Sequence, residues 1–140
     1  MPAHRQQPLL RASVPGVRPR PAASSALRMG SALCGMGVLH LLRPALFDGL
    51  IPRSLPGAPR AWTLGSGIAE LGAGGLLLYP GTRRAGGWAA AALFVGVWPG
   101  NVTMAWRARR SSPARRAVAL VRLPLQIPMI TGALRIAREG

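Results

Sequence analysis

Five polar residues lie inside long apolar stretches of this chain and are the candidates for its chemistry: His40, Glu70, Asn101, Arg122 and Gln126. Imidazole, carboxyl, amide and guanidinium groups can exchange protons, form ion pairs or hold a polar ligand. Inside a membrane such groups are costly unless they face a partner or a wet cavity. These five side chains are therefore predicted to form a polar network or a ligand-binding site.

The apolar stretches that carry these residues predict four membrane-spanning helices, at about residues 25–43, 61–79, 87–106 and 117–136. Each stretch is close to the roughly 20 residues that a helix needs to cross a bilayer. The chain is 49% hydrophobic and has only three acidic residues, which favours a membrane protein over a soluble fold. The predicted fold class is an all-α, antiparallel four-helix bundle embedded in a membrane.

The positions of the five polar residues along these helices agree in depth. In a bundle of alternating direction, the ends of the first and third helices share one membrane side with the starts of the second and fourth. His40 is near the end of the first helix and Glu70 about two turns into the second. Asn101 lies just over a turn before the end of the third helix, and Arg122 and Gln126 near the start of the fourth. All five are predicted to occupy the same half of the membrane.

An ion pair between Glu70 and Arg122, across the second and fourth helices, is the predicted centre of this cluster, since Arg122 is the only intramembrane cation at matching depth. Gln126 follows Arg122 by four residues and shares its helix face, so it could add hydrogen bonds together with Asn101. The same network could instead serve only to set the register of the helices.

The formal charge of +15 comes entirely from arginine and is not interpreted as nucleic-acid binding. No nucleic-acid-binding motif is present, and aromatic residues are not interleaved with the basic ones. The arginines lie in the N-terminal tail and between the apolar stretches, where they would contact lipid phosphates. The predicted partner of these charges is membrane lipid.

No catalytic residues and no metal site are predicted. The single cysteine, Cys34, excludes an internal disulfide and a cysteine-based metal site. His40 could shuttle protons, hydrogen-bond a ligand or serve a structural role. It could also hold a metal or haem, with Met36 or Met104 as the second haem ligand. Neither a set of serine, histidine and acid nor a pair of carboxylates is arranged for catalysis, so an enzymatic activity is not predicted.

The segments outside the apolar stretches have compositions of their own. Residues 1–23 form an Arg- and Pro-rich tail that cannot bury a core and is predicted to be disordered. After Pro44, a short amphipathic helix is predicted over residues 45–51, with Phe47 toward lipid or bundle. Residues 52–59 contain three prolines and predict a loop that caps the polar half of the bundle. Pro99 should kink the third long helix just before the candidate asparagine.

Several motifs follow one another in a characteristic order. They are residues 37–40, Pro44 with Phe47, Ile51 with Pro52, Leu55 with Pro56, residues 66–70, Pro80 with Arg83 and Arg84, Pro99 and Asn101 with Met104, and Arg122 with Pro124, Leu125 and Gln126. In this order, which covers nearly everything after the tail, the chain resembles small bacterial DoxX-like membrane proteins. The resemblance implies a four-helix protein of the bacterial inner membrane whose working part is the cluster of five polar residues.

The DoxX-like family takes its name from a subunit associated with thiosulfate oxidation and quinone reduction, and some relatives are linked to membrane-associated thiol and oxidative-stress systems. Most members have no assigned activity. Because this chain has no second cysteine, the resemblance implies no thiol chemistry here. Three functions remain open. The first is an accessory protein with an intramembrane pocket for a small amphipathic ligand, a quinone or a lipid. The second is a small proton-coupled exporter, a homodimer that uses Glu70. The third is a structural subunit of an oxidoreductase.

Overall fold

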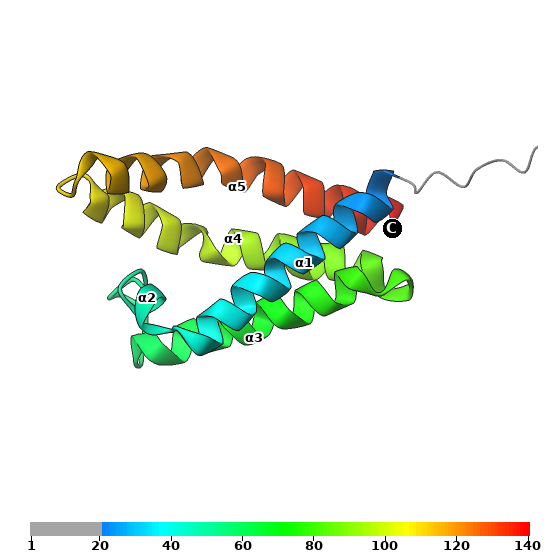
Figure 1. Cartoon of the computed structure of the whole chain (residues 1–140), viewed down its shortest axis with the longest axis horizontal. Coiled ribbons are helices and arrows are strands. Elements are labelled where there is room, and N and C mark those ends of the chain that lie inside the picture. The colour runs from blue at the N-terminus through cyan, green and yellow to red at the C-terminus, as the bar shows by residue number, and fades with distance from the viewer. Residues whose placement is uncertain (1–20) are drawn as a thin grey trace, which may run out of the picture.

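The computed structural model describes residues 21–140, and these residues are almost entirely helical (Figure 1). The elements are α1 (Pro21–Leu42), α2 (Ala45–Asp48), α3 (Pro59–Leu78), the 3₁₀ helix η1 (Pro80–Thr82), α4 (Arg83–Ala108) and α5 (Pro113–Glu139). No strand occurs between residues 21 and 140. The prediction of an all-α fold is therefore confirmed for the part of the chain that the structure describes.

The helices extend beyond the apolar stretches that predicted them. Residues 1–20 of the predicted tail lie outside the described residues, but residues 21–23 belong to α1, so the tail prediction is wrong for these three residues. Proline fits the first turn of a helix, because a backbone N–H at that position would have no partner within the helix, and α3 and α5 both begin with proline. Arginine, a good helix former, continues α4 and α5 past their apolar segments.

A short helix follows Pro44, as predicted, but α2 ends at Asp48 rather than at residue 51. Gly49 closes the helix, since its N–H bonds back to the carbonyl oxygen of Phe47. The helix is tied down on two sides: Arg60 Nε donates to Asp48 Oδ2 at 2.8 Å, and Arg107 donates to the carbonyl oxygen of Gly49. Desolvation raises the pKa of Asp48, but hydrogen bonds from Arg60 and Thr63 and the charge of Arg60 together outweigh it, so this pKa lies below its ordinary value.

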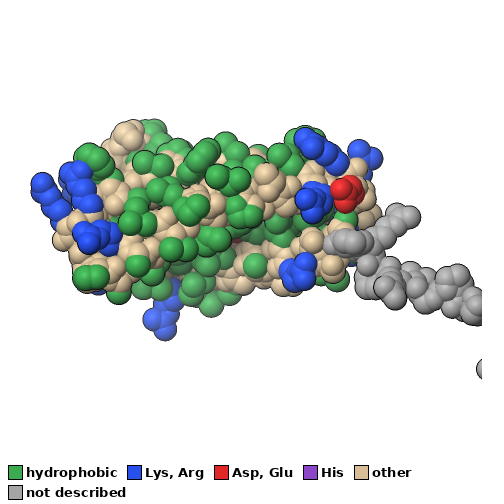
Figure 2. All heavy atoms as spheres, turned by 90° about the horizontal axis from the view of Figure 1, so that it is seen from above, with side chains coloured by type: hydrophobic (Ala, Val, Ile, Leu, Met, Phe, Trp, Pro, Cys, Tyr) green, Lys and Arg blue, Asp and Glu red, His purple; other side chains and the backbone are tan. Residues whose placement is uncertain are grey.

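Three helices are long and apolar enough to cross a membrane: α1, α4 together with η1, and α5. The 20-residue helix α3 is not among them, because its glycines and Glu70 lower its mean hydropathy. Figure 2 shows hydrophobic side chains over the middle of the visible face and basic side chains gathered toward its two ends. Apolar surface between basic ends is the distribution expected of a membrane protein.

The long helices pack as two pairs. Helix α1 lies along α3 and α4 lies along α5, whereas the pairs meet more sparingly, through α3 with α4 and α1 with α5. The pairs converge at one end and diverge at the other, where α2 is located (Figure 1). The buried apolar core lies at the converging end, in the early parts of α1 and α4 and the late parts of α3 and α5. Its residues are Ala26, Leu33, Ala73, Leu77, Ala90, Ala91, Phe94, Ala133 and Ile136.

Glycines bring the backbones within each pair into direct contact. A Cβ added to Gly37 would lie 2.7 Å from the carbonyl oxygen of Gly67, and one added to Gly74 would lie 2.8 Å from that of Gly30. Without side chains in the way, α1 and α3 approach closely and gain dispersion contacts along their length. The approach also brings Gly67 against His40, since a Cβ added to this glycine would lie 2.9 Å from the histidine Cβ.

Candidate functional site

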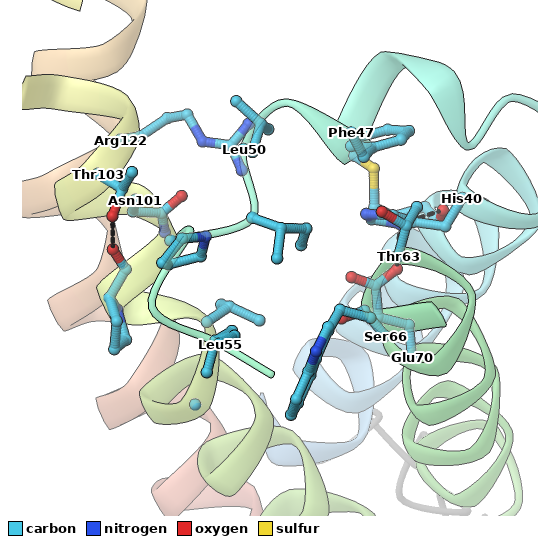
Figure 3. A pocket seen from close by; sticks show the side chains of 18 of the residues that line it. His40, Phe47, Leu50, Leu55, Thr63, Ser66, Glu70, Asn101, Thr103 and Arg122 are labelled. Carbon is cyan, nitrogen blue, oxygen red and sulfur yellow. Dashed lines mark hydrogen bonds and ion pairs between the residues drawn. The ribbon is translucent and has the colours of Figure 1, made fainter. Parts of the chain in front are cut away.

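Two adjoining cavities lie between the α1–α3 pair and the α4–α5 pair. The first, here called the α2 cavity, has a volume of about 390 Å³ and lies beneath α2 and the loop that follows it (Figure 3). The second, the α1–α5 cavity, has a volume of about 640 Å³ and is lined by α1, α3, α4 and α5. Residues that line both are Met36, Glu70, Val97, Asn101 and Arg122. Both volumes fall in the range of roughly 300–1,000 Å³ typical of ligand pockets.

The five sequence-predicted residues all line this hollow. His40 lines the α2 cavity, Gln126 lines the α1–α5 cavity, and Glu70, Asn101 and Arg122 line both. The structure therefore brings all five to one region, at the end of the molecule where the helix pairs diverge. They do not form a single network, because His40 and Glu70 lie on one wall and Asn101 and Arg122 on the opposite wall (Figure 3). Gln126 belongs to the second wall, since it bonds to Asn101.

On the α1–α3 wall, His40 contacts Glu70. His40 Nδ1 is 2.9 Å from Glu70 Oε2 and 3.0 Å from the carbonyl oxygen of Met36. Two acceptors at this distance favour a proton on Nδ1. Of these two contacts of His40, only the one with Met36 has the geometry of a hydrogen bond. The buried Oε2 of Glu70 is in ion-pair contact with His40 but can still accept a hydrogen bond. The ring of Phe47, from α2, stacks on the imidazole with ring centroids 3.8 Å apart.

The predicted ion pair between Glu70 and Arg122 is wrong. Glu70 contacts His40, and Arg122 acts on the carboxylate only through longer-range electrostatic attraction. The reason is the packing of the helices: α3 packs closely on α1, through glycines such as Gly67, whereas α5 packs chiefly on α4. The carboxyl group therefore meets the side chain on its neighbouring helix first.

On the α4–α5 wall, Asn101 and Gln126 bond to each other. Asn101 Nδ2 donates to Gln126 Oε1 at 2.6 Å, and Gln126 Nε2 donates to the carbonyl oxygen of Phe94 at 2.6 Å. Both amides are buried, at 7% and 3% exposed. The sequence predicts that they support a Glu–Arg pair, but in the structure they join α4 to α5. The carbonyl group that Gln126 binds, that of Phe94, lies in the turn before Pro99. Helix α4 continues past Pro99 as one helix.

We expect Gln126→Leu to lower the free energy of unfolding by about 1–3 kcal/mol, because the buried Asn101 amide would lose its acceptor. The double variant Asn101→Leu with Gln126→Leu should recover part of this loss, since both polar groups are then replaced by apolar ones. Titration with sodium dodecyl sulfate in mixed micelles, followed by circular dichroism, measures the free energy of unfolding of each protein. A single variant as stable as the wild type would contradict the assigned hydrogen bonds.

Arg122 stands apart from both pairs. Within residues 21–140 its guanidinium makes no hydrogen bond and no ion pair, although it lines both cavities. In Figure 3 its side chain extends from the α4–α5 wall toward Leu50, in the segment after α2. A guanidinium carries five N–H donors and stays charged at any physiological pH. Arg122 is therefore a cation with unused binding capacity at the junction of the two cavities.

Sequence reasoning missed two residues of the site, Thr63 and Phe47. Thr63 is 1% exposed and lines the α2 cavity. It precedes Glu70 by seven residues and so shares its helix face, a spacing that could have identified it. For Phe47, no local pattern indicates that α2 folds over His40. Among residues 21–140, no group of three or more His, Cys, Asp or Glu side chains could hold a metal ion.

These features define an all-helical membrane protein with a polar-lined hollow between two helix pairs. A scan of protein-family models matches residues 29–137 to DUF8561, a domain of unknown function, and the chain belongs to this family. A search of curated proteins and a search of solved structures gave no match. The family match provides no link to DoxX-like proteins.

Proposed function

We propose that the protein is a membrane component that binds a small amphipathic molecule, a quinone or a lipid, in the hollow between its helix pairs. The observation that carries this proposal is the pair of adjoining cavities, which combine a mainly apolar lining with a few polar side chains. Ligand pockets generally have this composition, since apolar walls supply affinity and a few polar groups fix orientation. The resemblance to DoxX-like proteins suggests an accessory role in a redox or stress-response system of the bacterial inner membrane.

In this proposal α1, α3, α4 and α5 cross the membrane in alternate directions, as an antiparallel four-helix bundle. Helix α3 is included because it is 20 residues long and its glycines pack it tightly against α1. Trp62 and Tyr79, near its two ends, are both exposed, as expected of aromatic residues at membrane interfaces. A homo-oligomer or a partner oxidoreductase subunit could contact the lipid-facing surface.

The test is to fill the hollow without disturbing the helices. Gly96 lines the α2 cavity, and a Cβ added there meets no atom within 4 Å. We expect Gly96→Leu to fold and to lose a bound small molecule that native mass spectrometry detects on the detergent-extracted wild-type protein. Gly72→Leu is the matched control, since Gly72 is equally open but lines neither cavity. A bound mass of equal occupancy in all three proteins would overturn the proposal.

A second candidate function, a proton-coupled exporter, is favoured by the state of Glu70. Its carboxyl faces the hollow, is not held by an arginine and has a buried oxygen without an aligned hydrogen bond. Such a group could exchange a proton for a cationic substrate. In proteoliposomes, ethidium should then drive proton movement in the wild type and not in Glu70→Gln. The absence of any ethidium-dependent proton movement in the wild type would dismiss this function.

A further inference from the structure

Arg122 needs an anion that this chain does not provide. The sequence contains three acidic residues, and none of them forms an ion pair with Arg122. Glu70 contacts His40, and Asp48 accepts a hydrogen bond from Arg60. Glu139 is the last residue of α5, roughly 25 Å along the helix from Arg122. Arg122 is exposed and lines both cavities, so its guanidinium is available to an anion of a bound molecule.

The position of Arg122 along α5 strengthens the argument for a bound anion. It lies nine residues after the start of α5, roughly 13 Å along the helix, whereas Arg115 and Arg116 occupy the first turn. A charge at such depth is costly in a membrane unless a partner or water reaches it. Hydrogen bonds between a guanidinium and a carboxylate or phosphate are among the strongest in proteins, because the planar fork binds two oxygens at once.

The apolar part of the hollow continues from Arg122 toward the middle of the molecule. The α1–α5 cavity is lined along α5 from Arg122 to Gly132, roughly 15 Å at the rise of an α-helix. This is about half of the ~30 Å hydrocarbon thickness, which is the depth of one leaflet. Its other lining residues include Met29, Leu33 and Met129, and α1 touches α5 less closely than it touches α3. The cavity matches one acyl chain in length and chemistry.

We infer that the ligand is an anionic amphiphile, an acyl chain that ends in a carboxylate or a phosphate. Its head binds to Arg122 at the junction of the cavities, and its chain lies in the α1–α5 cavity. The hydroxyl-bearing residues Thr63 and Ser66 line the α2 cavity on the wall that faces Arg122. Glu70 is also on this wall, opposite Arg122, and its carboxyl group contacts His40. This inference rests on the proposed ligand-binding function and specifies the chemistry of the ligand.

The experiment compares ligands that share a chain and differ in charge. The full chain in dodecyl maltoside is titrated with oleate, with oleoyl lysophosphatidate and with oleyl alcohol, and native mass spectrometry reports the occupancy. At least one of the two anions should bind the wild type about tenfold or more tightly than the alcohol, the ratio expected for one charge-assisted hydrogen bond or more. Whichever of the two anions binds more tightly identifies the head as carboxylate or phosphate.

The variant Arg122→Gln should lose about tenfold in affinity for the preferred anion, and Arg122→Lys should retain more of it. The matched control is Arg28→Gln, because Arg28 lines the far end of the same cavity and the substitution removes the same charge. Its guanidinium already donates to Ser25 Oγ at 3.5 Å. Circular dichroism checks that each variant is folded. If Arg122→Gln does not fold, the affinity of Arg122→Lys for the anion serves as the test.

Two results would overturn the inference. One is equal affinity of the wild type for oleyl alcohol and both anions. The other is loss of the anion in Arg28→Gln while Arg122→Gln binds normally. If the alcohol or decylubiquinone binds and Gly96→Leu abolishes that binding, the ligand-binding function stands while the anionic head is refuted. If none of these molecules binds the wild type, both proposals fail together.

Discussion

Replacing Gly87 by alanine should lower the free energy of unfolding by about 1–3 kcal/mol, the cost of overpacking a tight contact. A Cβ at this position would lie 2.5 Å from the backbone nitrogen of Ala137 and 2.8 Å from the carbonyl oxygen of Ala133. Both atoms belong to the backbone of α5, which cannot move aside as a flexible side chain can. The α4–α5 contact must therefore widen, and a titration with sodium dodecyl sulfate measures the cost.

The control for this prediction is Gly96→Ala, which adds the same methyl group to the same helix. A Cβ at Gly96 meets no atom within 4 Å, so only the helix propensity changes. Alanine is favoured over glycine in a helix interior by up to about 1 kcal/mol, so this variant should be as stable as the wild type or more stable. Equal destabilisation of both variants would show that α4 and α5 do not approach closely at Gly87.

Replacing His40 by leucine should cost about 2–3 kcal/mol of stability, because Glu70 would lose its ion-pair partner while 6% exposed. The double variant His40→Leu with Glu70→Leu should recover most of this loss, since breaking a buried pair costs more than replacing both partners. The four proteins form a double-mutant cycle, and the unfolding titration measures the coupling. Strictly additive effects would show that the two side chains do not interact.

These two predictions probe opposite ends of the molecule. Gly87 is at the converging end, where the apolar core is buried, and His40 is at the diverging end, beside the cavities. Close packing at one end holds the helix pairs together, so that they can separate at the other without losing the fold. A hollow large enough for a ligand can thus persist in a molecule of this size.

Local properties of the sequence determined the helices of this protein and the position of each polar residue along its helix. Apolar stretches of some twenty residues predict the four long helices, because the backbone hydrogen bonds of a helix close within a single segment. The position of Glu70 or Arg122 along its helix then follows from counting residues. For the same reason the helix ends were predicted less well, since arginine and proline at the ends of α4 and α5 continue the helix beyond the apolar segment.

Only the tertiary structure decided which polar residues are partners. The pairing of Glu70 with His40, and of Asn101 with Gln126, depends on α1 lying against α3 and α4 against α5. Those contacts are made where glycines far apart in the sequence meet another backbone, as Gly37 meets Gly67. The spacing of residues along one helix carries no information about the neighbour that its glycines will meet. Because α3 packs on α1, Glu70 contacts His40 and not Arg122. Arg122 therefore faces the cavities, where the proposed ligand binds.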